Sequence, residues 1–262
     1  MTFKIYLTAI FSVVVIMHGN IYARGDAPLL PLTKKELIQS IQKTPIESPE
    51  HIKLIISACN SHLLETAYEQ YTLIWQKQPN NGSANLRRGV TAMEYWEYAT
   101  VPAVNELPLS SPKAEEVANA ASSCLEKAVE LLPNSASANA EYGHLLFYRG
   151  DTDMGVKLLK KAEALAPKSA TAFELLGAIH ASPNPPYYQP KLAEKELRLA
   201  MRLAPFDSYP HWVLASLYLD ERQYSQAQTE LHSYLDLAPP ELAQESYVKK
   251  MQLWIARGLN NN

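Results

Sequence analysis

The chain has 262 residues, of which 47 % are hydrophobic and 19 % charged, so it is neither disordered nor a multi-pass membrane protein. It contains only nine glycines, about half of the usual frequency of roughly 7 %, which argues against turn-rich sandwiches, barrels and Gly-rich phosphate-binding folds. The formal net charge of −3 provides no electrostatic footprint for nucleic acid.

An apolar stretch near the N-terminus, residues 5–17, follows Lys4. It is shorter than the roughly 20 residues that a transmembrane helix needs, and its length is typical of the core of a signal peptide. Ala23 provides a plausible cleavage site. We therefore predict a signal peptide over residues 1–23 and a periplasmic or secreted protein. The alternative is an uncleaved N-terminal anchor.

Residues 24–47 are predicted to be a linker with one short capping helix over residues 34–43. Thr33 and Glu36 have the spacing of a capping box, which opens such a helix. Ser48 and Pro49 then have the pattern of an N-cap followed by proline at the first helical position. A longer helix is expected to begin there.

A periodic series of prolines dominates the rest of the chain. The series consists of Pro79, Pro133, Pro167, Pro205 and Pro239, and the last four each close a similar phrase, such as "AVELLP" and "AEALAP". Two of the separations are 34 residues, and the others are longer. Proline cannot continue a helix, so a period of about 34 residues closed by proline indicates helix–turn–helix repeats.

The register within the repeats supports this interpretation when each recurring proline is counted as position 32. Position 8 is small in four repeats, at Gly89, Gly143, Gly177 and Ala215. Position 24 is large, at Tyr71, Leu125, Leu159, Leu197 and Leu231. The sequence departs from the pattern at Ile55, on position 8 of the first repeat, and at Arg88, on position 7 of the second.

With this register the chain resembles the tetratricopeptide repeat family. The resemblance implies an all-α fold, a right-handed α–α superhelix of about five helix–turn–helix units with terminal capping helices. The five repeats would span residues 48–81, 82–135, 136–169, 170–207 and 208–241. Residues 242–262 would form a C-terminal capping helix and tail. Its amphipathic pattern also suits a helix that docks on a partner or a membrane.

Two insertions interrupt the period, at residues 93–118 and near residues 182–190. Both follow the first helix of a repeat, so they would project from the same edge, where repeat proteins often bind partners. Aromatic residues gather there, at Tyr95, Trp96, Tyr98, Tyr187 and Tyr188. They are either binding anchors or a cover for the ends of their own helices.

The resemblance also implies that the first helix of each repeat lines a concave groove, chiefly through positions 2, 5, 9, 12 and 13. The candidate peptide-binding residues are Leu86, Val90, Met93, Ala140, His144, Phe147, Tyr148, Glu174, Tyr209, Trp212, Ser216 and Leu219; Glu94 and Asp220 also occupy such positions. This groove is mostly apolar and lacks the Lys, Arg and Asn with which some family members clamp acidic C-terminal peptides. A peptide or helix with apolar anchors is the expected partner.

No pattern of residues indicates catalysis, a metal or a cofactor. No two of the seven histidines have the helical spacing of a metal pair. Cys59 and Cys124 are expected to be two buried thiols rather than one disulfide. The main hypothesis is a non-catalytic interaction scaffold or adaptor of the cell envelope. An assembly factor for a membrane-associated envelope complex is the alternative, and an enzyme or small-molecule-binding protein is less favoured.

Overall fold

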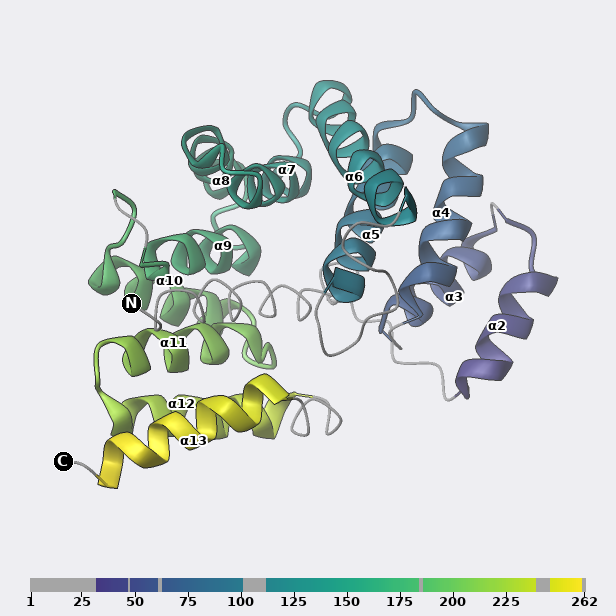
Figure 1. The fold of residues 1–262 in the computed structure, drawn as a ribbon. Coiled ribbons are helices and arrows are strands. Elements are labelled where there is room, and N and C mark those ends of the chain that lie inside the picture. Colours follow the sequence, from purple (N-terminus) through teal and green to yellow (C-terminus); the bar gives the residue numbers. More distant parts are fainter. Residues whose placement is uncertain are drawn as a thin grey trace. The chain divides into compact units, whose positions relative to one another are not determined.

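The computed structural model describes residues 32–46, 48–60, 63–100, 112–183, 186–238 and 246–260, and these residues form helices and turns with no strand among them (Figure 1). The predicted signal peptide, the N-terminal end of the linker and residues 101–111 of the longer insertion lie outside the described residues. The chain divides into two compact bodies within one helix, between Leu145 and Leu146. We call them the N-terminal and the C-terminal body.

Among the described residues, five helix pairs follow one another between two single helices. The first single helix is α2 (Lys34–Lys43), and the last is α13 (Ser246–Asn260). The pairs are α3 (Pro49–Asn60) with α4 (Leu64–Lys77), α5 (Gly82–Thr100) with α6 (Pro112–Leu131), α7 (Ala136–Tyr148) with α8 (Thr152–Leu165), α9 (Ala170–Ala181) with α10 (Pro190–Leu203), and α11 (Tyr209–Asp220) with α12 (Tyr224–Leu237).

The recurring prolines set where the second helix of each pair ends. Those helices end two residues before a recurring proline, at Lys77, Leu131, Leu165, Leu203 and Leu237. The proline ring disfavours the α conformation in the residue before it. Accordingly Ala166, which precedes Pro167, has φ −140° and ψ 72°, and Ala204, which precedes Pro205, has φ −134° and ψ 78°.

The same turn then leads into the next repeat. The residue two positions after the proline donates its backbone N–H to the carbonyl of the residue that precedes the proline. The donor–acceptor distance is 3.0 Å for Asn81, 3.0 Å for Ser135, 2.9 Å for Ser169 and 3.1 Å for Asp207. Proline thus occupies the second position of a turn, which its fixed φ suits. Two of these polar residues also cap the next helix: Asn81 Oδ1 accepts the N–H of Ala84, and Ser135 Oγ accepts that of Ala138.

The first two helices are capped in a similar way. Thr33 Oγ1 accepts the backbone N–H of Glu36 at 3.3 Å, and the Glu36 carboxylate accepts the backbone N–H of Thr33 at 2.8 Å. This reciprocal pair is a capping box and opens α2. Ser48 Oγ accepts the N–H of His51 at 3.1 Å at the start of α3.

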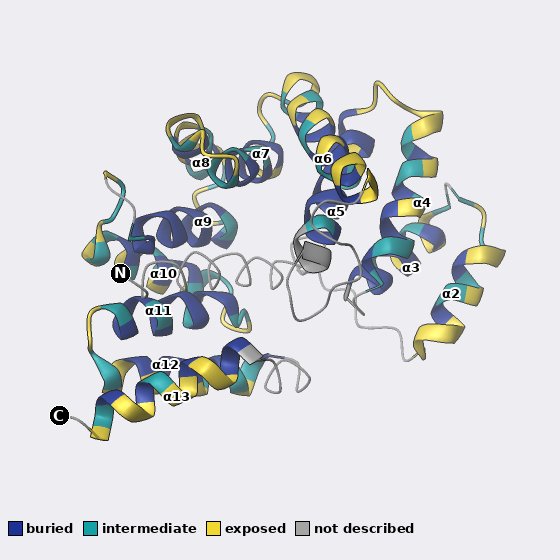
Figure 2. Cartoon of the chain, in the orientation of Figure 1, coloured by how far each residue is buried: buried dark blue, intermediate teal, exposed yellow. Residues whose placement is uncertain are grey.

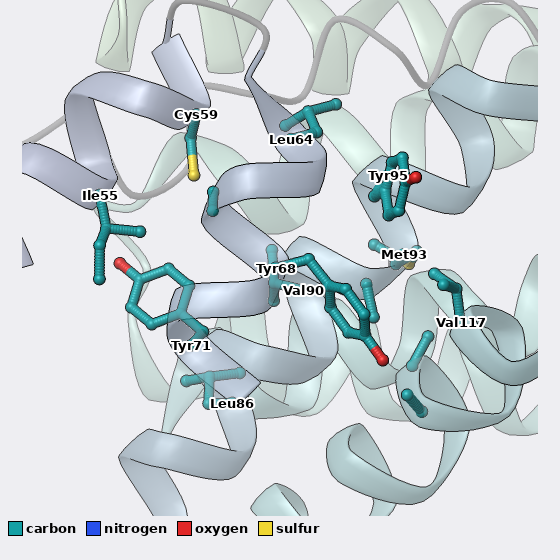
Figure 3. Close-up of a cluster of buried hydrophobic side chains, with 14 of the residues drawn as sticks. Ile55, Cys59, Leu64, Tyr68, Tyr71, Leu86, Val90, Met93, Tyr95 and Val117 are labelled. Carbon is teal, nitrogen blue, oxygen red and sulfur yellow. The ribbon is translucent and has the colours of Figure 1, made fainter. Parts of the chain in front are cut away.

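Small residues at position 8 let the two helices of a repeat approach closely. A Cβ atom added at Gly89 would lie 2.8 Å from Leu125 Cγ, and one added at Gly177 would lie 2.7 Å from Leu197 Cγ. Both leucines occupy position 24, so the small position of one helix receives the large position of its partner. In the first repeat Ile55 replaces the small residue and belongs, with Tyr71, to the buried cluster of the N-terminal body (Figure 3).

Repeats three and five turn between their helices through a residue with positive φ. Gly150 has φ 87° and Arg222 has φ 60°. In both turns the next residue donates its backbone N–H to a carbonyl five residues earlier, Asp151 to Leu146 at 2.9 Å and Gln223 to Tyr218 at 2.7 Å. These are helix C-caps of the kind that favours glycine, so the arginine side chain strains the second of them.

The last helix, α13, covers the end of the C-terminal body. Its buried residues Val248, Met251 and Ile255 face the repeats, and Gly258 leaves room for the ring of Tyr224 on α12. The ring of Tyr247 lies 5.2 Å from that of Trp212 on α11. Among the described helices, none combines the length and the apolar character that crossing a membrane requires.

Candidate protein-binding surface

Most of the residues expected to line the groove are buried in the structure (Figure 2). In the N-terminal body these are Leu86, Val90 and Met93 on α5, and Ala140 and His144 on α7. Leu86, Val90 and Met93 belong to the main buried cluster (Figure 3). Burial lowers the pKa of His144 to about 3, so its ring is neutral at physiological pH.

The predicted groove residues of the C-terminal body are also mostly buried. Glu174, Tyr209, Trp212 and Leu219 are buried, whereas Ser216 is half-buried and donates its hydroxyl to the Trp212 carbonyl at 3.1 Å. The Trp212 ring lies 5.2 Å from the Tyr234 ring and equally far from the Tyr247 ring. Trp212 therefore joins α11, α12 and α13, and in this structure it holds the capping helix in place.

Phe147 and Tyr148 differ from these aromatic residues because both are half-buried. They stand at the C-terminal end of α7, with their ring centroids 5.7 Å apart and their planes at 73°. This edge-to-face arrangement is one that aromatic pairs prefer, so it favours the observed orientation of both rings. Of the described aromatic side chains that the sequence predicted for the groove, these two keep accessible surface.

Two aromatic residues of the longer insertion pack into their own body. Tyr95 is buried, with its ring 6.0 Å from that of Tyr68 and 5.7 Å from the Lys113 ammonium. Trp96 is half-buried against the same cluster. Tyr98 lies in α5, but its side chain is outside the described part of the chain. Tyr95 and Trp96 therefore pack within the N-terminal body.

The tyrosines of the shorter insertion reach neighbouring repeats. The Tyr187 hydroxyl donates to the carboxylate of Asp153 on α8, in repeat three. Burial and the negative charges of Glu221 and Asp220, in repeat five, raise the pKa of Tyr188. Burial, helped by Glu221, also raises the pKa of Asp220 to about 7. This loop thus bridges the repeats on either side of its own.

Two buried carboxylates lie on the first helices of repeats two and three. Glu94 on α5 and Glu141 on α7, in the N-terminal body, are 5 % and 0 % exposed. Burial raises the pKa of Glu94 well above its usual range, and the charge of Glu141 raises it further. Glu94 was expected in the groove from its repeat position, whereas Glu141, at position 6 of its repeat, was not.

The departure at Arg88 has a structural explanation that the sequence did not provide. Its guanidinium carbon lies 4.2 Å from the centre of the Trp75 ring. Its nitrogen atoms donate to Thr72 Oγ1 at 3.1 Å, Cys124 Sγ at 3.1 Å and Tyr68 Oη at 3.3 Å. Arg88 therefore occupies position 7, where repeats one, four and five have Leu54, Leu176 and Leu214, by stacking on rings and binding hydroxyl and thiol groups.

The cysteine and histidine side chains, which could in principle take part in chemistry, also make contacts within the fold. Both cysteines are buried free thiols, as expected. His180 pairs with Glu196 at 2.6 Å, and His211 pairs with Glu230 at 2.7 Å, in each case between the two helices of one repeat. Within the described residues, no group of three or more His, Cys, Asp and Glu side chains is placed to hold a metal ion.

Comparison with known proteins shows which solved structures have a similar fold. No family model and no curated protein matches the sequence. Among solved structures, TTC0263, a thermophilic TPR protein of Thermus thermophilus, is 16 % identical, with a TM-score of 0.58 over 79 % of this chain and 96 % of its own. PilF of Pseudomonas aeruginosa is also 16 % identical, with a TM-score of 0.53 over 86 % of each chain.

The chain has the tetratricopeptide-repeat fold. The expected fold class, an all-α TPR array of helix pairs, is thus confirmed. At 16 % identity the likeness establishes the TPR fold alone.

Proposed function

We propose that the protein is a non-catalytic scaffold that binds a protein partner through the first helices of its TPR repeats. The partner is a peptide or a helix with apolar anchors. The observation that carries the proposal is the pair Phe147 and Tyr148, two half-buried rings in edge-to-face contact at the end of α7. Rings of this kind supply contact area at small entropic cost, which is why they recur as binding anchors.

The buried candidates have a supporting role in this proposal. Trp212, Tyr209 and Met93 are closed to solvent, so they fix the positions of the first helices rather than contact a partner in this conformation. Ser216 is half-buried and remains available to a partner at the edge of that face.

The test uses the full chain as bait in an extract of the cell envelope. Replacing Phe147 and Tyr148 together with Ala is expected to remove a specific partner while the circular dichroism spectrum is unchanged. A matched control replaces the exposed Leu73 and Leu131 with Ala and should retain that partner. Equal recovery of the partner by the Phe147→Ala/Tyr148→Ala variant would refute the assignment of this surface.

We also propose that the protein acts outside the cytoplasm, because residues 1–23 have the composition of a signal peptide. Mass spectrometry of the protein from its native host tests this, with a mature chain beginning near Arg24 as the expected result. A chain that retains its N-terminal residues and partitions with membranes would favour the uncleaved anchor. That outcome would fit an assembly factor for a membrane-associated envelope complex, the second candidate.

A further inference from the structure

The second helices of the repeats carry opposite charges in the two bodies. In the N-terminal body, α4 and α6 together have six Glu residues against three Lys residues. In the C-terminal body, α8 and α10 together have seven Lys and Arg residues against four Asp and Glu residues. We call the outer sides of α4 and α6 the acidic face and those of α8 and α10 the basic face. Each body therefore presents a surface that is complementary in charge to one on the other body.

The change of sign falls on equivalent positions of the repeat. At positions 22 and 25 the acidic face has Glu69, Thr72, Ser123 and Glu126. At the same positions the basic face has Lys157, Lys160, Lys195 and Arg198. All of these residues except Thr72 are exposed. Because equivalent positions of stacked repeats lie on the same side of the array, the like charges of each body gather on one surface.

On α10 the cations form a single stripe along the helix. Their spacings of four, three and four residues place them on the side opposite the buried Ala193, Leu197 and Ala200. The stripe extends over about 16 Å at 1.5 Å per residue. It consists of Lys191, Lys195, Arg198 and Arg202.

Most of these cations have no carboxylate partner within the chain. Glu194 pairs with Arg198 at 3.0 Å and Glu196 pairs with His180 at 2.6 Å, so two carboxylates of α10 are already engaged. Six cations of the basic face form no ion pair with any described residue: Lys157, Lys160, Lys161, Lys191, Lys195 and Arg202. The same is true of four carboxylates on the acidic face: Glu69, Glu115, Glu116 and Glu126.

Exposed apolar side chains lie on the same second helices. Leu73 is on α4, Leu131 is on α6, and Met154 and Leu165 are on α8, with exposed fractions between 37 % and 43 %. Apolar side chains surrounded by polar ones are typical of protein–protein interfaces. An anionic membrane would use the basic face alone, whereas a protein that carries both signs of charge would use both faces.

We propose that this protein is a second copy of the same chain, and that copies associate head to tail, with the basic face of one copy on the acidic face of the next. Complementary charges favour this encounter and disfavour contact between two like faces. Because the two contacting faces differ, each pair of copies keeps one unused face of each sign, and the contact generates rings or open chains. The first helices take no part in it, so the inference goes beyond the proposed peptide-binding function.

The average mass of the purified full chain, measured by light scattering, tests the association. In about 0.1 M salt the mass should exceed 29.3 kDa and rise with protein concentration. In about 1 M salt, where the Debye length falls from about 10 Å to about 3 Å, the mass should return toward that of one chain. A mass of 29.3 kDa at every concentration in the lower salt would overturn the inference.

Reversing the charge of one face at a time tests which surfaces meet. The variants Lys157→Glu/Lys195→Glu and Glu69→Lys/Glu126→Lys should each associate at least about tenfold more weakly than the unmodified chain, because like charges then face each other. An equal mixture of the two variants should associate again, since each reversed face finds its complement on the other variant. Residues 1–23 are the same in all of these chains, so association through them would persist in each variant alone.

A matched control reverses two charges elsewhere. Lys249→Glu/Lys250→Glu changes two exposed lysines on α13 and should leave the association unchanged. Circular dichroism checks that all variants fold. A mixture of the two face variants that associates no more than either alone would overturn the head-to-tail contact.

A membrane is the other possible occupant of the basic face. A chain that stays monomeric but binds phosphatidylglycerol vesicles, and loses that binding in Lys157→Glu/Lys195→Glu, would overturn self-association and assign the basic face to anionic lipid. The peptide-binding proposal is judged separately, because both face variants keep Phe147 and Tyr148 and should recover the same partner from an extract.

Discussion

Gly177 and Leu197 allow a direct test of the close helix contact at position 8 of the repeat. A Cβ atom added at Gly177 would lie 2.7 Å from Leu197 Cγ and 3.3 Å from the Ala193 carbonyl oxygen. Carbon atoms in contact rest about 3.5–4.0 Å apart, so the added methyl group lies about 1 Å too close. The helices of repeat four would have to separate, or Leu197 would have to leave its rotamer.

The expected free-energy changes follow from this geometry. Overpacking costs about 1–3 kcal/mol, and alanine regains about 1 kcal/mol of helix propensity over glycine, so Gly177→Ala should destabilise by about 1 kcal/mol. Leu197→Ala, at a fully buried site, should cost about 2–5 kcal/mol. In the double variant the new methyl group occupies space that Leu197 has left, so the combined loss should be smaller than the sum by about 1 kcal/mol or more.

Urea unfolding of the unmodified chain, the two single variants and the double variant, followed by far-ultraviolet circular dichroism, measures this coupling. Gly150→Ala is the control, because a Cβ there meets no atom within 4 Å and its cost comes from the positive φ. Its effect should add to that of Leu197→Ala. Additive losses for Gly177→Ala and Leu197→Ala, within about 0.5 kcal/mol, would refute the close-contact explanation.

Three further changes test other parts of the structure. Arg222→Gly should raise the free energy of unfolding by about 1 kcal/mol in urea titrations, because φ is 60° there; no gain would contradict the strain. Glu94 has a raised pKa, so the folded chain binds more protons than the unfolded chain and stability falls as the pH rises above the usual carboxyl pKa. Glu94→Gln should therefore lower the loss of Tm between about pH 5 and about pH 8 in thermal scans, whereas an unchanged loss would contradict this source. Trp212→Ala should destabilise the chain by about 3–5 kcal/mol, and a loss below about 1 kcal/mol would contradict its place between α12 and α13.

Much of the fold could be predicted because it depends on local geometry. A proline restricts its own φ and the conformation of the residue before it, so Pro133 or Pro167 marks a helix end wherever the helix packs. Gly177 and Leu197 were identifiable because a small residue recurs at position 8 and a large one at position 24 in other repeats. These signals need no knowledge of the tertiary structure.

The candidate site was harder to predict because burial depends on neighbours far away in the sequence. Tyr95 and Trp212 are of the residue types that serve as binding anchors, yet both lie in the interior. Residue type alone does not separate the two roles, because core packing and partner binding use the same amphipathic rings. The charge of Glu141 raises the pKa of Glu94, and this effect depends on the tertiary structure. Arg88 broke the repeat pattern, but its contacts with Trp75 and Cys124 depend on how α4, α5 and α6 pack.

Nuclear magnetic resonance with a display-selected peptide tests the central claim, that a partner binds on the first helices of the repeats. The peptide is titrated into the isotope-labelled chain, and the amide shifts are assigned to helices. The account predicts that the largest changes fall on α5, α7, α9 and α11, with Phe147 and Tyr148 among the strongest. Changes concentrated on the second helices, α4, α6, α8, α10 and α12, would contradict it.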